Sequence, residues 1–288
     1  MKTLAFSAAP TADGVTESGS SSAFAAVRTW LVVLHRANPV LSWTGWLHLL
    51  LLPGALLGLV LDERLVTNVN PWIKPLKFLF SDIIYLWGLG WVLADLPAAA
   101  LRAVRRISWG VAVAIGIEII IVFLQAARGT TSHYNIASPL DGVLFSLMGV
   151  FIMLNTVLIV WAVYLVWRHR PHGPAGYVWG VRLGLLLFLV GSAVGGAMIR
   201  NLAHTVGAAD GGPGLLGVGW STRAGDLRIA HFLGLHALQL VPLLGWWLSR
   251  YVPRRATLLT WVGAALYAGA VAALYVQAMQ GVPLIAVK

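Results

Sequence analysis

Residues 107–127, ISWGVAVAIGIEIIIVFLQAA, form an apolar stretch of 21 residues with a single ionisable side chain, that of Glu118. About 20 consecutive apolar residues suffice for a helix to cross the hydrocarbon core of a bilayer. A surface helix of a soluble protein would instead alternate an apolar face with a charged one. The stretch therefore predicts a membrane-spanning helix, and its buried carboxyl group makes Glu118 the first candidate functional residue.

Six further stretches of similar length and composition accompany this one, at residues 41–61, 72–94, 140–167, 177–199, 227–248 and 258–279. The chain is 59% hydrophobic and 10% charged, with a mean hydropathy of +0.81. A soluble domain carries about 25% charged residues, so this composition excludes a water-soluble enzyme, a disordered protein and a coiled coil. It predicts an all-α integral membrane bundle of about seven transmembrane helices.

The amino-terminal region differs from these spans. Residues 1–22 are rich in Ser, Ala, Gly and Thr and lack the apolar run of a signal peptide, so they are expected to form a disordered tail. Residues 23–37, AFAAVRTWLVVLHRA, are too short to span and predict an amphipathic helix at the membrane interface. Residues 38–288 would then form the seven-helix transmembrane domain.

The absence of cysteine excludes disulfides and thiolate chemistry.

The basic residues that flank the spans predict the orientation of the chain. Eleven lie on the side of the amino terminus and eight on the opposite side. Cytoplasmic loops of membrane proteins carry the excess of Lys and Arg, so the amino terminus is placed in the cytoplasm and the carboxyl terminus outside. The net charge of +10 then reflects topology. The expected partner is the lipid bilayer, with no nucleic acid.

Polar residues recur at helical spacing in four of the spans. They are Lys74, Lys77 and Ser81 in residues 72–94, Glu118 and Gln125 in 107–127, Asp141, Met148 and Asn155 in 140–167, and Arg228, His231, His236 and Gln239 in 227–248. Polar stripes that face lipid are costly, so the four stripes are expected to face one another around a polar cavity in the outer half of the bundle. The long external loop 200–226 is expected either to cover this cavity or simply to tolerate insertions.

The deepest ionisable residues, Asp82, Glu118 and His236, are the candidate catalytic residues. Glu118 and His236 are expected to pair, either to share a proton or to bind a metal, with Asp82 as a second carboxylate. The alternative is a neutral acid hydrogen-bonded to a neighbouring helix. His48 would either bridge a haem with His236 or make an interhelical hydrogen bond.

Candidate ligand-binding residues lie nearer the outer face. His204, His231 and His236 are the candidate metal ligands, and His133 with His204 and His231 is a second possible set for zinc, iron or copper. The candidate substrate-binding residues are Lys74, Lys77, Gln125, Asp141 and Arg228. They would orient an anionic or quinone-like substrate, although basic residues at this level also contact lipid headgroups.

Two segments, NPWIKPLKF at residues 70–78 and GWSTRAGDLRIAHFLGLHALQ at 219–239, carry a resemblance to known proteins. They are similar to segments of a family of bacterial multi-pass inner-membrane proteins. The resemblance implies a bacterial inner-membrane setting and transfers no catalytic residue.

Three hypotheses for function follow from these residues. The first is a membrane oxidoreductase that uses haem or a transition metal in an outward-facing pocket. The second is a proton-coupled small-molecule transporter or channel in which Glu118, relayed by Asp82, carries the proton. The third is a non-catalytic assembly or sensory partner. The absence of internal repeats and the confinement of the polar stripes to the outer half favour a one-sided site over a path through the bundle, with Asn155 and Arg182 as the main exceptions in the cytoplasmic half.

Overall fold

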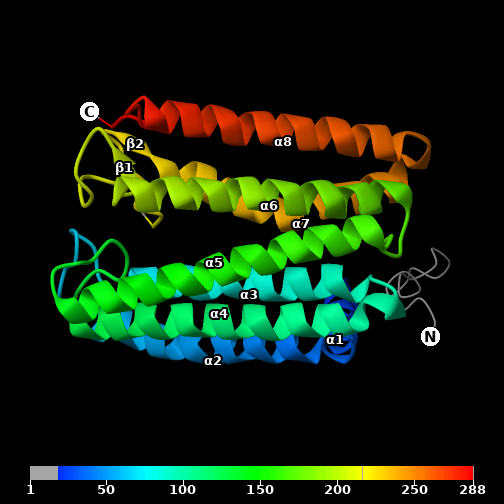
Figure 1. The fold of residues 1–288 in the computed structure, drawn as a ribbon, viewed down its shortest axis with the longest axis horizontal. Helices are drawn as coiled ribbons and strands as arrows, with labels where there is room; N and C mark the ends of the chain where they lie inside the picture. The colour runs from blue at the N-terminus through cyan, green and yellow to red at the C-terminus, as the bar shows by residue number, and fades with distance from the viewer. Residues whose placement is uncertain (1–18, 216, 288) are drawn as a thin grey trace.

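The computed structural model describes residues 19–215 and 217–287, which are mainly helical (Figure 1). The helices are α1 (Gly19–Ala37), α2 (Pro39–Leu61), α3 (Ile73–Ala94), α4 (Leu101–Arg128), α5 (Pro139–Arg168), α6 (Ala175–Asn201), α7 (Leu227–Tyr251) and α8 (Ala256–Met279). Short 3₁₀ turns, Ala98–Ala100 and Pro253–Arg255, precede α4 and α8. Strands β1 (Thr205–Val206) and β2 (Gly225–Asp226) pair antiparallel.

Helices α2 to α8 are each long and apolar enough to cross a membrane, so the chain is a multi-pass membrane protein. The seven predicted spans are confirmed as helices. The largest difference is that α4 begins at Leu101 rather than at residue 107, because the 3₁₀ turn leads directly into it. Residues 1–18 of the predicted tail lie outside the described residues, and residues 19–22 belong to α1.

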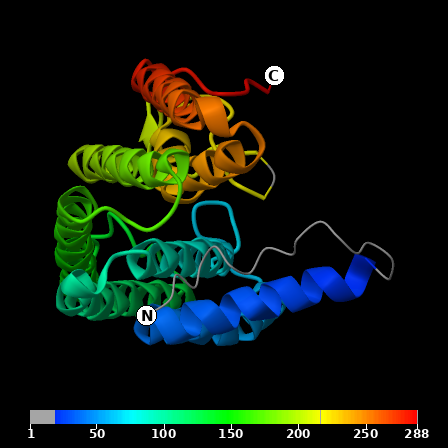
Figure 2. The same ribbon diagram turned by 90° about the vertical axis from the view of Figure 1, so that its right-hand side faces the viewer.

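The spanning helices run side by side, so their connections gather at two ends of the bundle (Figure 1). One end, called here the short-loop end, holds the connections 95–100, 169–174 and 252–255. The other, the long-loop end, holds residues 62–72, 129–138, 202–226 and 280–287. Figure 2 shows that α1 runs across the direction of the other helices, and Trp30 of α1 stacks on Trp91 of α3. This placement is the one expected of an interfacial helix.

Close backbone contact joins α6 to α7. A Cβ atom added at Gly191 would lie 2.6 Å from the carbonyl carbon of Gly234, and one added at Gly184 would lie 2.7 Å from the carbonyl oxygen of Ala237. Membrane helices use small residues in this way because the lipid gives no hydrophobic drive for association. Gly191 therefore lies at a close contact between the two helices, whereas a Cβ at Gly196 would meet nothing within 4 Å.

The carboxyl group of Asp95, which was not among the candidate residues above, is buried at the short-loop end. The hydroxyl of Tyr177 in α6 donates to Asp95 Oδ2 over 2.5 Å, and the backbone N–H of His172 donates to the Asp95 carbonyl over 2.8 Å. Asp95 is 5% exposed. These bonds fix the end of α3 to the start of α6.

We expect Asp95→Asn to flatten the pH dependence of stability. Burial raises the pKa of Asp95 to about 6, although the Tyr177 hydrogen bond opposes this rise. Because the folded state holds this proton more tightly than the unfolded chain, the stabilisation is complete below about pH 4 and is lost as the pH rises through about 6. The free energy of unfolding that Asp95 contributes should fall by about 3 kcal/mol over this pH range. It is measured by thermal unfolding of the detergent-solubilised protein from pH 4 to 8. Parallel curves for the two proteins would contradict the role of Asp95.

Candidate functional site

A row of three side chains connects the long-loop end to the interior of the bundle. Glu118 of α4 is 5% exposed, and its Oε1 lies 3.3 Å from Nε2 of His133. The Nδ1 atom of the same imidazole lies 3.0 Å from Nζ of Lys74 in α3. Because a lysine ammonium can only donate, Nδ1 accepts, and the ring proton resides on Nε2, directed at Glu118. The three groups thus form one hydrogen-bonded series.

The turn between α4 and α5 folds back into the bundle and so positions His133. Gly129 ends α4 in the left-handed conformation, and Tyr134 also has a positive φ of 57°. The side-chain amide of Asn135 holds the turn by donating to Thr130 Oγ1 and to the Thr131 carbonyl. The imidazole consequently lies in an aromatic enclosure made by Phe78, Tyr134 and Phe145.

This enclosure sets the charge of His133. Burial lowers the pKa of His133 below its usual value, the Lys74 ammonium lowers it further, and Glu118 opposes both. The enclosure therefore favours the neutral imidazole, whose single proton lies between Lys74 and Glu118. A neutral imidazole with one donor and one acceptor nitrogen is able to pass a proton across its ring.

A second carboxyl–histidine pair joins α2 to α3. Oδ2 of Asp82 in α3 lies 3.6 Å from Nε2 of the fully buried His48 in α2. His48 Nε2, Asp82 Oδ2 and Glu118 Oε2 are buried without a hydrogen-bond partner among the described residues. Buried polar atoms of this kind call for an explanation, and a transferable proton or a water molecule supplies one.

The two pairs follow one another in depth. At about 1.5 Å rise per residue, Glu118 and Asp82 lie roughly 15 Å inside the long-loop ends of α4 and α3, and His48 lies roughly 20 Å inside that end of α2. The other ring nitrogen of His48, Nδ1, lies 2.8 Å from the Thr44 carbonyl oxygen, one turn nearer the short-loop end. Nearer the short-loop end, Ser42 Oγ lies 3.3 Å from His35 Nδ1. Polar groups therefore continue along α2 past the middle of the bundle.

The long connection 202–226 is bonded to the long-loop ends of α3 and α7. Lys77 Nζ donates to the Val218 carbonyl over 2.7 Å. Arg228 Nη2 donates to the Gly219 carbonyl over 2.5 Å, and its Nε and Nη2 both bond Asp226. Lys77 and Arg228, which were expected to bind substrate, therefore hold this loop in the structure.

Gln125 and Asp141 form a closed structural network. Asp141 Oδ1 accepts from Gln125 over 2.9 Å and from Arg128 over 2.6 Å, while its Oδ2 accepts from Ser138 over 2.6 Å. The Ser138 hydroxyl in turn caps the first turn of α5. Both carboxylate oxygens are satisfied, so these bonds fix α4 to α5 around the turn that carries His133.

The structure does not bring the candidate metal ligands together. His231 Nδ1 lies 2.8 Å from the Gly191 carbonyl, His204 pairs with Asp210 over 3.1 Å, and the ring of His236 packs on Phe232. Among the described residues, no three His, Cys, Asp or Glu side chains are grouped so as to hold a metal ion. The partner of Glu118 is His133 rather than the expected His236. His48 contacts a carboxyl group of another helix, in keeping with the interhelical alternative.

The polar stripes meet in pairs. Tyr85 of α3 donates to Asn155 of α5 over 2.8 Å, and Gln239 of α7 donates to the Ile84 carbonyl over 3.4 Å. Several polar side chains that were expected to line one shared cavity thus form direct hydrogen bonds between helices instead.

Comparisons of the chain with protein-family models, curated proteins and solved structures find no match. Function is therefore inferred from the geometry of these residues alone.

Proposed function

We propose that the protein moves protons through the α2–α3–α4 part of the bundle, as the proton-carrying core of a proton-coupled transporter or channel. The observation that supports this most is the series Lys74–His133–Glu118, followed by the Asp82–His48 pair. Ionisable groups inside membrane spans are costly and commonly mark proton pathways. Here four such groups, Lys74, Glu118, Asp82 and His48, are joined by His133 of the turn between α4 and α5.

The proton would enter by two linked transfers. Lys74 Nζ gives a proton to His133 Nδ1 while His133 Nε2 gives its proton to Glu118 Oε1. The ring keeps one proton throughout, the glutamate becomes neutral, and Lys74 regains a proton from the aqueous side. From Glu118 the proton would pass on to Asp82 and His48, whose side-chain atoms Oδ2 and Nε2 lie 3.6 Å apart.

We also propose that the membrane is a bacterial inner membrane, with the long-loop end outside. The excess of basic residues at the short-loop end supports this orientation. The resemblance of residues 70–78 and 219–239 supports the setting.

The proton relay has more support than the metal- or haem-dependent oxidoreductase. Glu118 and His133 already contact each other at a distance that suits proton transfer. The three candidate metal ligands each contact a different neighbour.

Proton flux into proteoliposomes that contain a pH-sensitive dye tests the proposal. The wild-type protein is expected to acidify the vesicles when an inward proton gradient is imposed. Asp82→Asn is expected to lower the rate by at least about tenfold, because an amide cannot carry the proton. Glu63→Gln, which removes an exposed acid from the long-loop end, is the matched control and should leave the rate unchanged. A wild-type rate no greater than that of empty vesicles would reject the proposal.

A further inference from the structure

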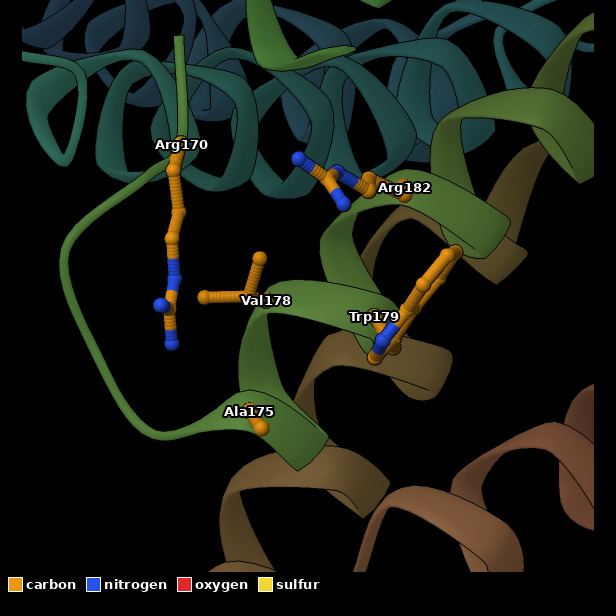
Figure 3. A pocket seen from close by; sticks show the side chains of 5 residues that line it. All are labelled: Arg170, Ala175, Val178, Trp179 and Arg182. Atoms are coloured by element: carbon orange, nitrogen blue, oxygen red, sulfur yellow. The ribbon is translucent and has the colours of Figure 1, made fainter.

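A cavity of about 310 Å³ lies at the short-loop end, at the opposite end of the bundle from Lys74 and His133. It is lined by Arg170, Ala175, Val178, Trp179 and Arg182. Figure 3 shows Arg170 descending from the connection between α5 and α6, and Arg182 extending from α6 toward that connection. Two guanidinium groups therefore border a space whose remaining lining is apolar.

Arg182 lies inside a membrane span, seven residues after the start of α6 and so roughly 10 Å along the helix. Its Nε donates to the Val166 carbonyl over 3.1 Å. The guanidinium carbon lies 5.1 Å from the ring centroids of both Trp167 and Trp179. These contacts hold the group in a fixed plane, but none of them supplies a negative charge.

Arg170 likewise forms no ion pair within the described part of the chain. Among the ion pairs that the described residues form, none includes Arg170 or Arg182. Asp95, a buried acid of this end, accepts the Tyr177 hydrogen bond. Arg182 inside its span and Arg170 in the adjoining connection thus place two positive charges at an apolar cavity, with no ion pair to an acid among the described residues. This arrangement indicates an anionic ligand from outside the chain.

We propose that this cavity binds the phosphate group of an anionic phospholipid. Guanidinium groups bind phosphate oxygens through paired N–H donors, and basic pockets beside transmembrane helices bind lipid headgroups. Val178 and Trp179 provide an apolar wall for the glycerol and the first methylene groups. Trp167, Trp179 and Trp261, whose rings contact in series, form the kind of aromatic belt found at the level of headgroups. This site is independent of the proposed proton pathway.

Native mass spectrometry and thermal unfolding of the purified protein test the proposal. With phosphatidylglycerol in mixed micelles, the wild-type protein is expected to retain bound lipid and to show a higher Tm than with phosphatidylcholine. The Arg170→Gln and Arg182→Gln double variant should lose at least tenfold in apparent affinity for phosphatidylglycerol. Because Arg182 contacts packed tryptophans, the single variant Arg170→Gln, at an exposed position, must also weaken binding.

Two comparisons make the test specific. Arg102→Gln and Arg250→Gln remove exposed arginines of the same end that do not line the cavity, and they should bind the lipid as the wild type does. Inorganic phosphate alone should leave the Tm unchanged. Equal lipid binding by the double variant and the wild type would overturn the site. An equal rise in Tm with inorganic phosphate would overturn the assignment to a lipid and leave a site for free phosphate.

Discussion

Glu118→Gln is expected to reduce proton flux through the reconstituted protein by about 100-fold or more, the range typical of a lost proton-transfer group. Glutamine keeps the size of the side chain and still accepts a hydrogen bond from His133 Nε2, which now lies 3.3 Å from Oε1. It cannot hold the transferred proton, so the series is broken at its buried end. The measurement is the initial rate of dye quenching in proteoliposomes under a fixed proton gradient.

The matched variants separate chemistry from folding. Glu118→Asp keeps a carboxyl group on a shorter side chain, so it should retain part of the flux. His133→Gln keeps a polar side chain in the aromatic enclosure but cannot pass a proton across a ring, and it should lose most of the flux. If Glu118→Gln unfolds at the wild-type temperature and conducts at the wild-type rate, Glu118 lies outside the pathway.

Gly191→Ala is expected to destabilise the protein by about 3 kcal/mol, near the upper end of the usual cost of overpacking. The added Cβ would lie 2.6 Å from backbone atoms of Gly234, and backbone cannot rotate aside as a side chain can. Helices α6 and α7 would have to separate. Their separation would also lengthen the bond between His231 and the Gly191 carbonyl, now 2.8 Å. Thermal unfolding in detergent measures the loss.

Gly196→Ala is the control for this substitution. It lies five residues later in the same helix, where an added Cβ meets nothing within 4 Å. Alanine there should be neutral or stabilise by up to about 1 kcal/mol, because it lowers the backbone entropy of the unfolded chain. Equal Tm values for the two variants would show that the contact between Gly191 and Gly234 does not limit stability.

The spans were predictable from sequence because each depends on local composition. A run of apolar residues such as 107–127 must be helical inside a bilayer, where every backbone group needs a partner in the same segment. Two helix ends also depend on local residues: Gly129 ends α4 in the left-handed conformation, and the Ser138 side chain caps the start of α5. The depth of Glu118 and Asp82 followed from helical rise alone.

The pairing of those carboxyl groups was not predictable. His133 reaches Glu118 only because the turn after Gly129 folds inward, and that path depends on side-chain bonds from Asn135. Asp95 is buried through Tyr177, 82 residues later in the chain. Helical phase identifies which residues share a face, but it does not say which neighbouring helix or loop meets that face. A histidine in a short turn directly after a helix with a buried acid was the one signal for the Glu118 partner.

Infrared difference spectroscopy of the protein in lipid tests the proton relay most directly, because it detects protonated carboxyl groups. In the Asp95→Asn background, which removes the buried carboxyl group of the short-loop end, a carbonyl band from a buried carboxyl group should disappear when the pH is raised. The band should be absent when Glu118→Gln is added and shifted when Asp82→Asn is added. Glu63→Gln should retain it. A band that survives unchanged in both Glu118→Gln and Asp82→Asn would contradict proton exchange at this site.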